Sequence, residues 1–185
     1  MPKSSKEEVF LSERNILQEL RINARQSPEG IAKKFGYSRQ KVWRVLKKLE
    51  DDGVIWGYTA IVDMQKQGFK HYILLIKRTQ KKLDDNISDK LLTGKFKEIL
   101  CSGINDLSDH TFLEGCFYVY GEYDWVVSFY TKNILDAKEL CENLQRNCSD
   151  YIEYINLLET MFVGKKNWIQ NPLSINDIQT LKKIL

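Results

Sequence analysis

The most constraining feature of the sequence is a pair of helix signals set close together between residues 27 and 53. Ser27 followed by Pro28 is typical of a helix N-terminus, because serine caps the first turn and proline needs no hydrogen-bond donor there. Gly36 favours a left-handed helix stop, and Ser38 caps a further helix directly afterwards. Two short helices joined by a tight glycine turn predict a helix-turn-helix motif.

The helix after Ser38 has two different faces. At about 100° per residue, one face is an apolar stripe that should be buried, and it holds Val42, Val45, Leu46 and Leu49. Gln40, Arg44 and Lys47 fall on the opposite face, with Trp43 beside them. An earlier amphipathic helix is expected from Ser12, as its cap, to about Arg25.

Charge is concentrated in the same region. The chain of 185 residues carries a net charge of +3, and all of this excess lies within residues 1–63. Residues 27–48 contain seven basic side chains and one acidic side chain, Glu29. This asymmetry is expected of a surface that faces a polyanion, although charge alone would favour the alternative of a solvated helix face.

The stretch "VIWGYTAIVD" at residues 54–63 is β-branched and aromatic, with Gly57 as a turn point, and predicts a two-stranded wing. A winged helix-turn-helix would bind double-stranded DNA. Arginine and glutamine near the start of the recognition helix read bases, and lysines further along bind phosphates. Trp43 is more often a packing residue at such a position, and Trp56 is expected at the wing. The predicted DNA-binding residues are Ser27, Ser38, Arg39, Gln40, Lys41, Trp43, Arg44, Lys47 and Trp56.

The second half predicts the element order β, α, β, β, α, β, a ferredoxin-like arrangement. The expected elements are a strand at 71–79, a helix from Asp85 or Asn86 to Leu100, a loop at 101–111, a hairpin around "GEYD", a helix at 135–148 and a final strand at 151–164. Helices cover one face of such a sheet. Its other face, rich in aromatic and aliphatic residues, predicts a homodimer that would read a pseudo-palindromic operator.

Several classes of site are not indicated by the sequence. No run of apolar residues is long enough for a membrane span, and the start lacks a secretory signal, so a cytoplasmic location is expected. Cys101, Cys116, Cys141 and Cys148 show no metal-ligand spacing, so we expect no metal and no cofactor.

Taken together, residues 10 to about 168 resemble the Lrp/AsnC family of feast/famine transcription regulators. The resemblance rests on "LSERNILQELRINAR", "IAKKFGYSRQKVWRVLKKLEDDGVI" and "GYTAIVD", and more weakly on "GEYDWVVSF" and "YINLLETMF". It implies an α+β protein with a winged helix-turn-helix domain at 1–60 and a ferredoxin-like effector-binding and dimerisation domain at 61–170. It also implies homodimers that assemble into tetramers or octamers. Residues 171–185 extend past the usual end of the family, and their residues predict a helical extension whose helix starts at the cap Ser174.

The resemblance further implies an amino acid or related metabolite as effector, bound near Gly121, Tyr123 and Asp124. The alternative is that Gly121 and Asp124 only form the hairpin turn. The chain departs from the family at Val45 and Trp56, where family members often carry basic residues.

Two other functions compete with an effector-responsive regulator, which would not be an enzyme. Siroheme decarboxylases resemble Lrp/AsnC proteins, and their chemistry would call on His71, His110, Arg78 or Arg146. The second competing function is that of an architectural protein that coats DNA without a ligand.

Overall fold

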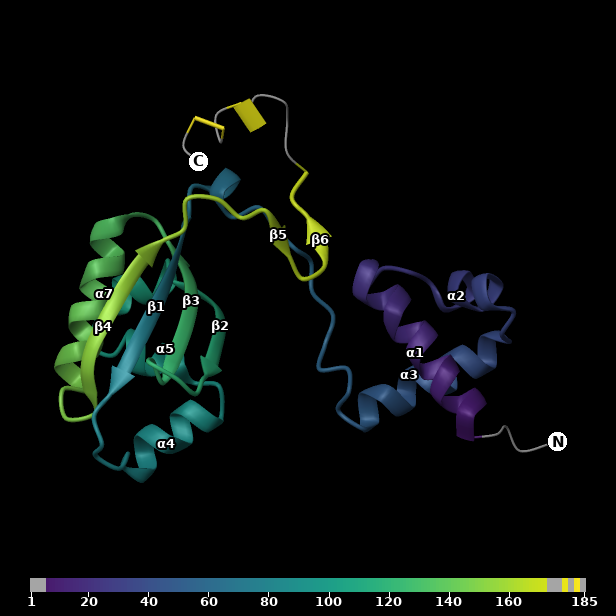
Figure 1. Cartoon of the computed structure of the whole chain (residues 1–185), viewed down its shortest axis with the longest axis horizontal. Helices are drawn as coiled ribbons and strands as arrows, with labels where there is room; N and C mark the ends of the chain where they lie inside the picture. The colour runs from purple at the N-terminus through teal and green to yellow at the C-terminus, as the bar shows by residue number, and fades with distance from the viewer. Residues whose placement is uncertain (1–5, 173–177, 180–181, 184–185) are drawn as a thin grey trace. The chain divides into compact units, whose positions relative to one another are not determined.

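The computed structural model describes residues 6–172, 178–179 and 182–183, and the chain divides into two compact units. One unit combines residues 1–62 with 163–185, and the other comprises residues 63–162. Figure 1 shows the three N-terminal helices of the first unit and the sheet of the second. The helix start expected at Ser174 lies outside the described residues.

Three helices form the core of the first unit: α1 (Lys6–Ile22), α2 (Pro28–Phe35) and α3 (Arg39–Asp51). The predicted α2 and α3 are confirmed, including their caps. The predicted start of α1 is wrong, because Ser12 lies buried inside the helix and donates to the Val9 carbonyl (2.8 Å). Its hydroxyl bonds to the preceding turn, an alternative to capping that serine uses within helices.

The two-stranded hairpin expected at residues 54–63 is not formed within the described chain, where this segment carries no strand. The N–H groups of Val54 and Ile55 instead donate to the Leu49 carbonyl (2.9 and 3.0 Å), and the chain then runs extended. Trp56 is 96% exposed. Ile55 packs against the core of the three helices, and an isolated two-stranded ribbon is marginally stable in water.

A short hairpin that the sequence did not predict lies in the same unit. It pairs β5 (Lys165–Lys166) with β6 (Ile169–Gln170) in antiparallel register. A single 3-10 turn, η1 (Gln65–Gln67), precedes the sheet in the second unit.

The second unit is built on a four-stranded antiparallel sheet of order β2-β3-β1-β4. Its strands are β1 (Lys70–Arg78), β2 (Phe112–Tyr118), β3 (Trp125–Thr131) and β4 (Ile152–Glu159). The two central strands of the sheet are β1 and β3, the first and third strands along the chain (Figure 1). This order confirms the predicted ferredoxin-like α+β fold.

The helices differ from the prediction in detail. The single helix expected up to Leu100 is two helices, α4 (Asp85–Leu92) and α5 (Phe96–Leu100), because Gly94 adopts a left-handed φ of +74° between them. The loop expected at 101–111 contains a short helix, α6 (Asn105–Asp109). The predicted C-terminal helix of the unit is confirmed as α7 (Ile134–Asn147), capped by Asn133.

The two faces of the sheet differ in burial. Alternate residues of β1 point to the helical side and are fully buried: Tyr72, Leu74 and Ile76. They pack with β3 and with Ala137, Leu140 and Leu144 of α7. The other face carries Ile73, Leu75, Val126, Phe117 and Leu158, of which Leu158 is 48% exposed. Within the described part of this unit, the sheet therefore presents an apolar face that no helix covers.

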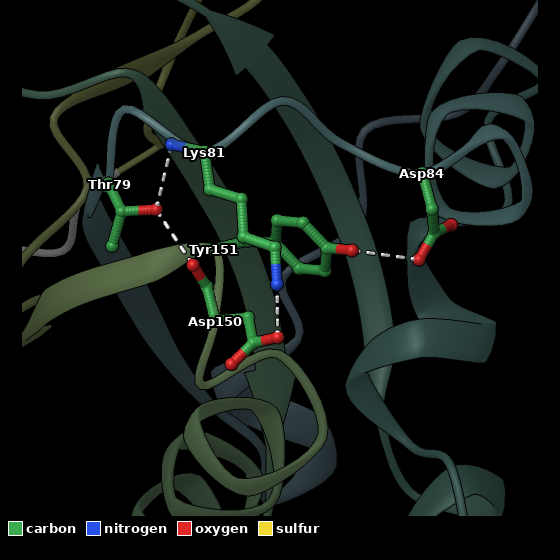
Figure 2. Close-up of polar contacts among 5 residues, drawn as sticks. All are labelled: Thr79, Lys81, Asp84, Asp150 and Tyr151. Carbon is green, nitrogen blue, oxygen red and sulfur yellow. Dashed lines mark hydrogen bonds and ion pairs between the residues drawn. The ribbon is translucent and has the colours of Figure 1, made fainter.

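A polar cluster ties the segment after β1 to the turn before β4 (Figure 2). Thr79 donates through Oγ1 to the Asp150 carbonyl (2.8 Å), and the Lys81 ammonium pairs with the Asp150 carboxylate. The Tyr151 hydroxyl donates to Asp84 Oδ2 (3.1 Å). Because Asp84 is also the N-cap of α4, these contacts fix where α4 begins relative to the sheet.

We expect Leu74→Ala to destabilise the protein by about 2 to 5 kcal/mol, because it leaves a cavity beneath the central strand. The measurement is urea denaturation of the full chain. Leu92→Ala, at an α4 position that is 81% exposed, is the control and should change stability by less than about 0.5 kcal/mol. Equal effects of the two substitutions would contradict the assignment of the core.

Candidate nucleic-acid interface

The turn between α2 and α3 is fixed by local hydrogen bonds. The Ser27 hydroxyl accepts from the Gly30 N–H, and the Ser38 hydroxyl accepts from the Lys41 N–H (both 3.1 Å). Gly36 has a φ of +68°, where a side chain would be strained, and ends α2. Ser27 and Ser38, both predicted to bind DNA, therefore serve as helix caps in this structure.

The faces of α3 lie as the periodicity predicts. Val42, Val45, Leu46 and Leu49 are buried and pack with Ile16 and Ile31. Gln40, Arg44 and Lys47 are exposed on the other side. Because Val45 is buried, a DNA contact is not available to it in this structure.

The charged side chains around α3 fall into two groups. Three of them form ion pairs within the unit: Arg39 with Glu29 (2.6 Å), Lys34 with Glu19 (2.5 Å) and Lys48 with Glu13 (2.6 Å). For Lys33, Arg44 and Lys47, no ion pair is found among the described residues. A phosphate can therefore approach Arg44 and Lys47 without displacing a carboxylate.

The side chains at the start of α3 are held by contacts that the sequence did not indicate. The Lys41 ammonium lies over the Tyr37 ring, 4.4 Å from its centroid, a cation–π geometry. Tyr37 in turn stacks on Phe35 (5.7 Å) and accepts a hydrogen bond from Asn15 of α1 (2.9 Å). The role of Glu29 in positioning Arg39 was also not anticipated, since the two residues are far apart in sequence and their helices must be placed first.

The two tryptophans predicted at the interface are both accessible. Trp43 is 52% exposed, so the packing role favoured from sequence describes only part of its surface. Trp56 follows the helix in the extended segment and is almost fully exposed.

The residues predicted to bind an effector lie in or beside the turn between β2 and β3. The Asp124 carboxylate accepts from the Arg78 N–H (2.9 Å) and lies 3.3 Å from Lys77 Nζ. Partial burial alone would raise the pKa of Asp124, but these two partners stabilise the carboxylate and its pKa is lowered. Asp124 thus fastens the turn to β1.

The other two residues of this group differ in their surroundings. Gly121 has a φ of +154° and no heavy atom near the position a Cβ would take. The Tyr123 hydroxyl accepts from the Asn156 side chain (2.7 Å), and its ring meets Tyr154 edge to face. The structure brings Tyr123 and Asp124 next to β4 and β1, respectively.

The histidines show no catalytic arrangement with the arginines named above. His71 is buried, with its Nδ1 2.6 Å from Thr160 Oγ1 and its Nε2 3.0 Å from Glu114 Oε2. His110 is exposed after α6. Among the described residues, no group of three or more His, Cys, Asp or Glu side chains could hold a metal ion, and no described helix has the length and apolarity of a membrane span.

Comparison with known proteins agrees with this geometry. A sequence profile for winged helix-turn-helix DNA-binding domains matches residues 11–55. The HTH-type transcriptional regulator LrpB of Bacillus subtilis is 43% identical over 54 residues, which cover 29% of this chain and 36% of LrpB. The aligned part is therefore about a third of that relative.

Solved structures extend the likeness to both units. The feast or famine regulatory protein of M. tuberculosis, complexed with L-methionine, has a TM-score of 0.66 at 17% identity, over 87% of this chain and 97% of that chain. E. coli AsnC has a TM-score of 0.57 at 19% identity, over 89% and 94% of the two chains. The resemblance found in the sequence is confirmed in the fold. The chain therefore shares the fold of these Lrp/AsnC structures, in which a helix-turn-helix segment that matches the winged helix-turn-helix profile is followed by an α/β unit with a four-stranded antiparallel sheet.

Proposed function

We propose that the protein is a sequence-specific DNA-binding transcription regulator of the Lrp/AsnC type, modulated by an amino acid or related metabolite. The observation that carries the proposal is the outer face of α3. It presents Gln40, Arg44 and Lys47 from a helix whose opposite side is anchored in the core. A function on DNA fits the cytoplasmic location expected from the sequence.

The contacts on α3 support different roles along the helix. Gln40 lies in the first turn, the part of a recognition helix that reaches base edges, and a glutamine amide can pair with adenine. Arg39 must exchange its ion pair with Glu29 for any base contact, so it contributes less net affinity than an unpaired arginine would. Arg44 and Lys47 lie further along the helix and suit phosphates.

A homodimer follows from the open face of the sheet. Its apolar side chains lie on all four strands, and soluble proteins rarely leave so continuous an apolar surface uncovered. A two-fold axis through this face would give each dimer two recognition helices for a pseudo-palindromic operator. Tetramers or octamers would require further contacts outside this face.

The proposal assigns no enzymatic activity to the chain. His71, the only buried histidine of the described residues, is engaged by Thr160 and Glu114. Unchanged absorbance in the Soret region on addition of a porphyrin substrate would be consistent with this, whereas turnover would establish the decarboxylase alternative.

The proposed function is tested by titrating the protein onto its own upstream DNA and onto random duplex at stated salt. Binding to the upstream DNA should be at least about 1,000-fold tighter than to random DNA. A ratio near one would refute a sequence-specific regulator.

Gln40→Ala should relax base preference at one position of each half-site, costing about 1 to 3 kcal/mol on the specific site and little on random DNA. Lys47→Ala should weaken binding to both DNAs alike, because a phosphate contact is independent of sequence. Competition binding with single-base operator variants measures the difference. Equal losses on both DNAs for both variants would contradict a base-reading end of α3.

Leu158→Glu should raise the dissociation constant of the homodimer by roughly 100-fold, because burying an unpaired carboxylate in an apolar interface costs about 3 kcal/mol. Sedimentation equilibrium checks this. Leu92→Glu is the matched control, since it adds the same charge at an exposed helix position. A dimer that persists unchanged in Leu158→Glu would place the interface elsewhere.

An amino-acid panel, beginning with L-methionine, should contain a ligand that changes operator affinity at least several-fold. Asp124→Asn should weaken this response about tenfold or more, because an ammonium group of the ligand loses its anion, while the amide oxygen still accepts from the Arg78 N–H. An unchanged response in Asp124→Asn would leave Asp124 with the turn-forming role alone. Absence of any responsive ligand would favour an architectural DNA binder.

A further inference from the structure

The β5–β6 hairpin has a turn conformation that its sequence does not favour. Asn167 and Trp168, the two residues between the strands, have φ values of +42° and +72°. Two left-handed residues suit the twist of a tight hairpin, and asparagine accepts this conformation. A bulky aromatic residue there is strained, and such strain persists where surrounding contacts hold it.

The contacts that hold Trp168 are cationic. The Arg21 guanidinium, in the last turn of α1, lies 4.2 Å from the centre of the indole ring, and Lys165 Nζ lies 5.7 Å from it. Trp168 is nevertheless 60% exposed. The indole therefore joins the hairpin to α1 and still presents a free surface to a ligand.

The two segments that make this contact are rich in basic residues. Residues 20–26 and 163–172 contain four cationic residues, Arg21, Arg25, Lys165 and Lys166, and no acidic residue. Arg21, Arg25 and Lys165 are exposed. A cluster of exposed arginine, lysine and tryptophan side chains matches the groups that bind a phosphate backbone.

The position of the hairpin within the unit also supports a role in DNA binding. Trp168 and Asn167 line a cleft of about 860 Å³ together with the end of α1 and residues 54–61. Those residues follow directly after the recognition helix and form no hairpin of their own. The only β-hairpin in the described part of this unit thus lies beside the segment where a wing was expected.

We propose that the β5–β6 hairpin, together with Arg21 and Arg25, is a second DNA-contacting element, which binds phosphates beside the site occupied by α3. Lys165 and Arg25 supply the charge, and stacking of Trp168 on Arg21 holds the hairpin against the three-helix domain. The element performs the bracing that a wing provides in other helix-turn-helix domains. The inference rests on the proposed DNA-binding function and extends the DNA-binding surface to residues far along the chain.

The test compares full-length variants by the salt dependence of operator binding. Lys165→Ala should reduce the slope of log affinity against log salt concentration by about 0.9, the value for one lost phosphate contact. Its affinity for operator and random DNA should fall by the same factor. Lys138→Ala, which removes an equal charge from the exposed side of α7 in the other unit, is the control and should leave the slope unchanged.

Trp168→Gly tests the contribution of the indole ring separately from that of the turn conformation. Glycine adopts a φ of +72° without strain, so the turn is retained while the stacking on Arg21 is lost. For Trp168→Gly, the slope of log affinity against log salt concentration should fall as it does for Lys165→Ala, because the hairpin is no longer held beside the DNA.

The outcomes are distinguishable from failure of the proposed function. If the wild-type protein binds no DNA specifically, the regulator proposal itself fails. If the wild-type protein binds but Lys165→Ala and Trp168→Gly keep its salt slope, the hairpin makes no phosphate contact and this inference is overturned. Tighter binding in either variant would also overturn it, since the hairpin would then shield the DNA-binding surface.

Discussion

Burial of one aliphatic stripe on α3 is the constraint on which the DNA-binding surface depends. Val42, Val45, Leu46 and Leu49 have to meet α1 and α2, and this fixes the rotation of the helix about its axis. Once that rotation is fixed, Gln40, Arg44 and Lys47 have to face outward. The lysine and arginine side chains of the ion pairs around the domain are more than half exposed, and ion pairs open to solvent contribute about 0 to 1 kcal/mol each. Apolar packing therefore orients the polar surface, and the charges decide what that surface attracts.

The parts of the structure that could be predicted are those encoded by neighbouring residues. Short-range interactions, between residues at most five positions apart, set the ends of α2 and α3. They involve Ser27, Pro28, Gly36 and Ser38. The β-rich run at 71–79 likewise predicted a strand, which is found as β1. In these places local preference and tertiary packing agree.

The parts that could not be predicted depend on distant contacts. The roles of Glu29 and Tyr37 at the start of α3 appear only after α1, α2 and α3 are placed. The hairpin expected at 54–63 is not formed in the described chain. By contrast, Asn167 and Trp168, which have no typical turn sequence, form the turn of a hairpin that Arg21 contacts. The candidate effector turn was located by its sequence, but the attachment of Asp124 to β1 through Arg78 was not foreseeable, since the two strands are not consecutive in the chain.

The division of the chain into units has a mechanical consequence. The chain leaves the three-helix domain after residue 62, builds the sheet unit, and returns to the first unit at residue 163. Two covalent connections join the units instead of one, and residues 56–63 form no backbone–backbone hydrogen bond within the described chain. The sheet unit is therefore an insertion between two segments of the three-helix unit, and a strain in either connection acts on both units.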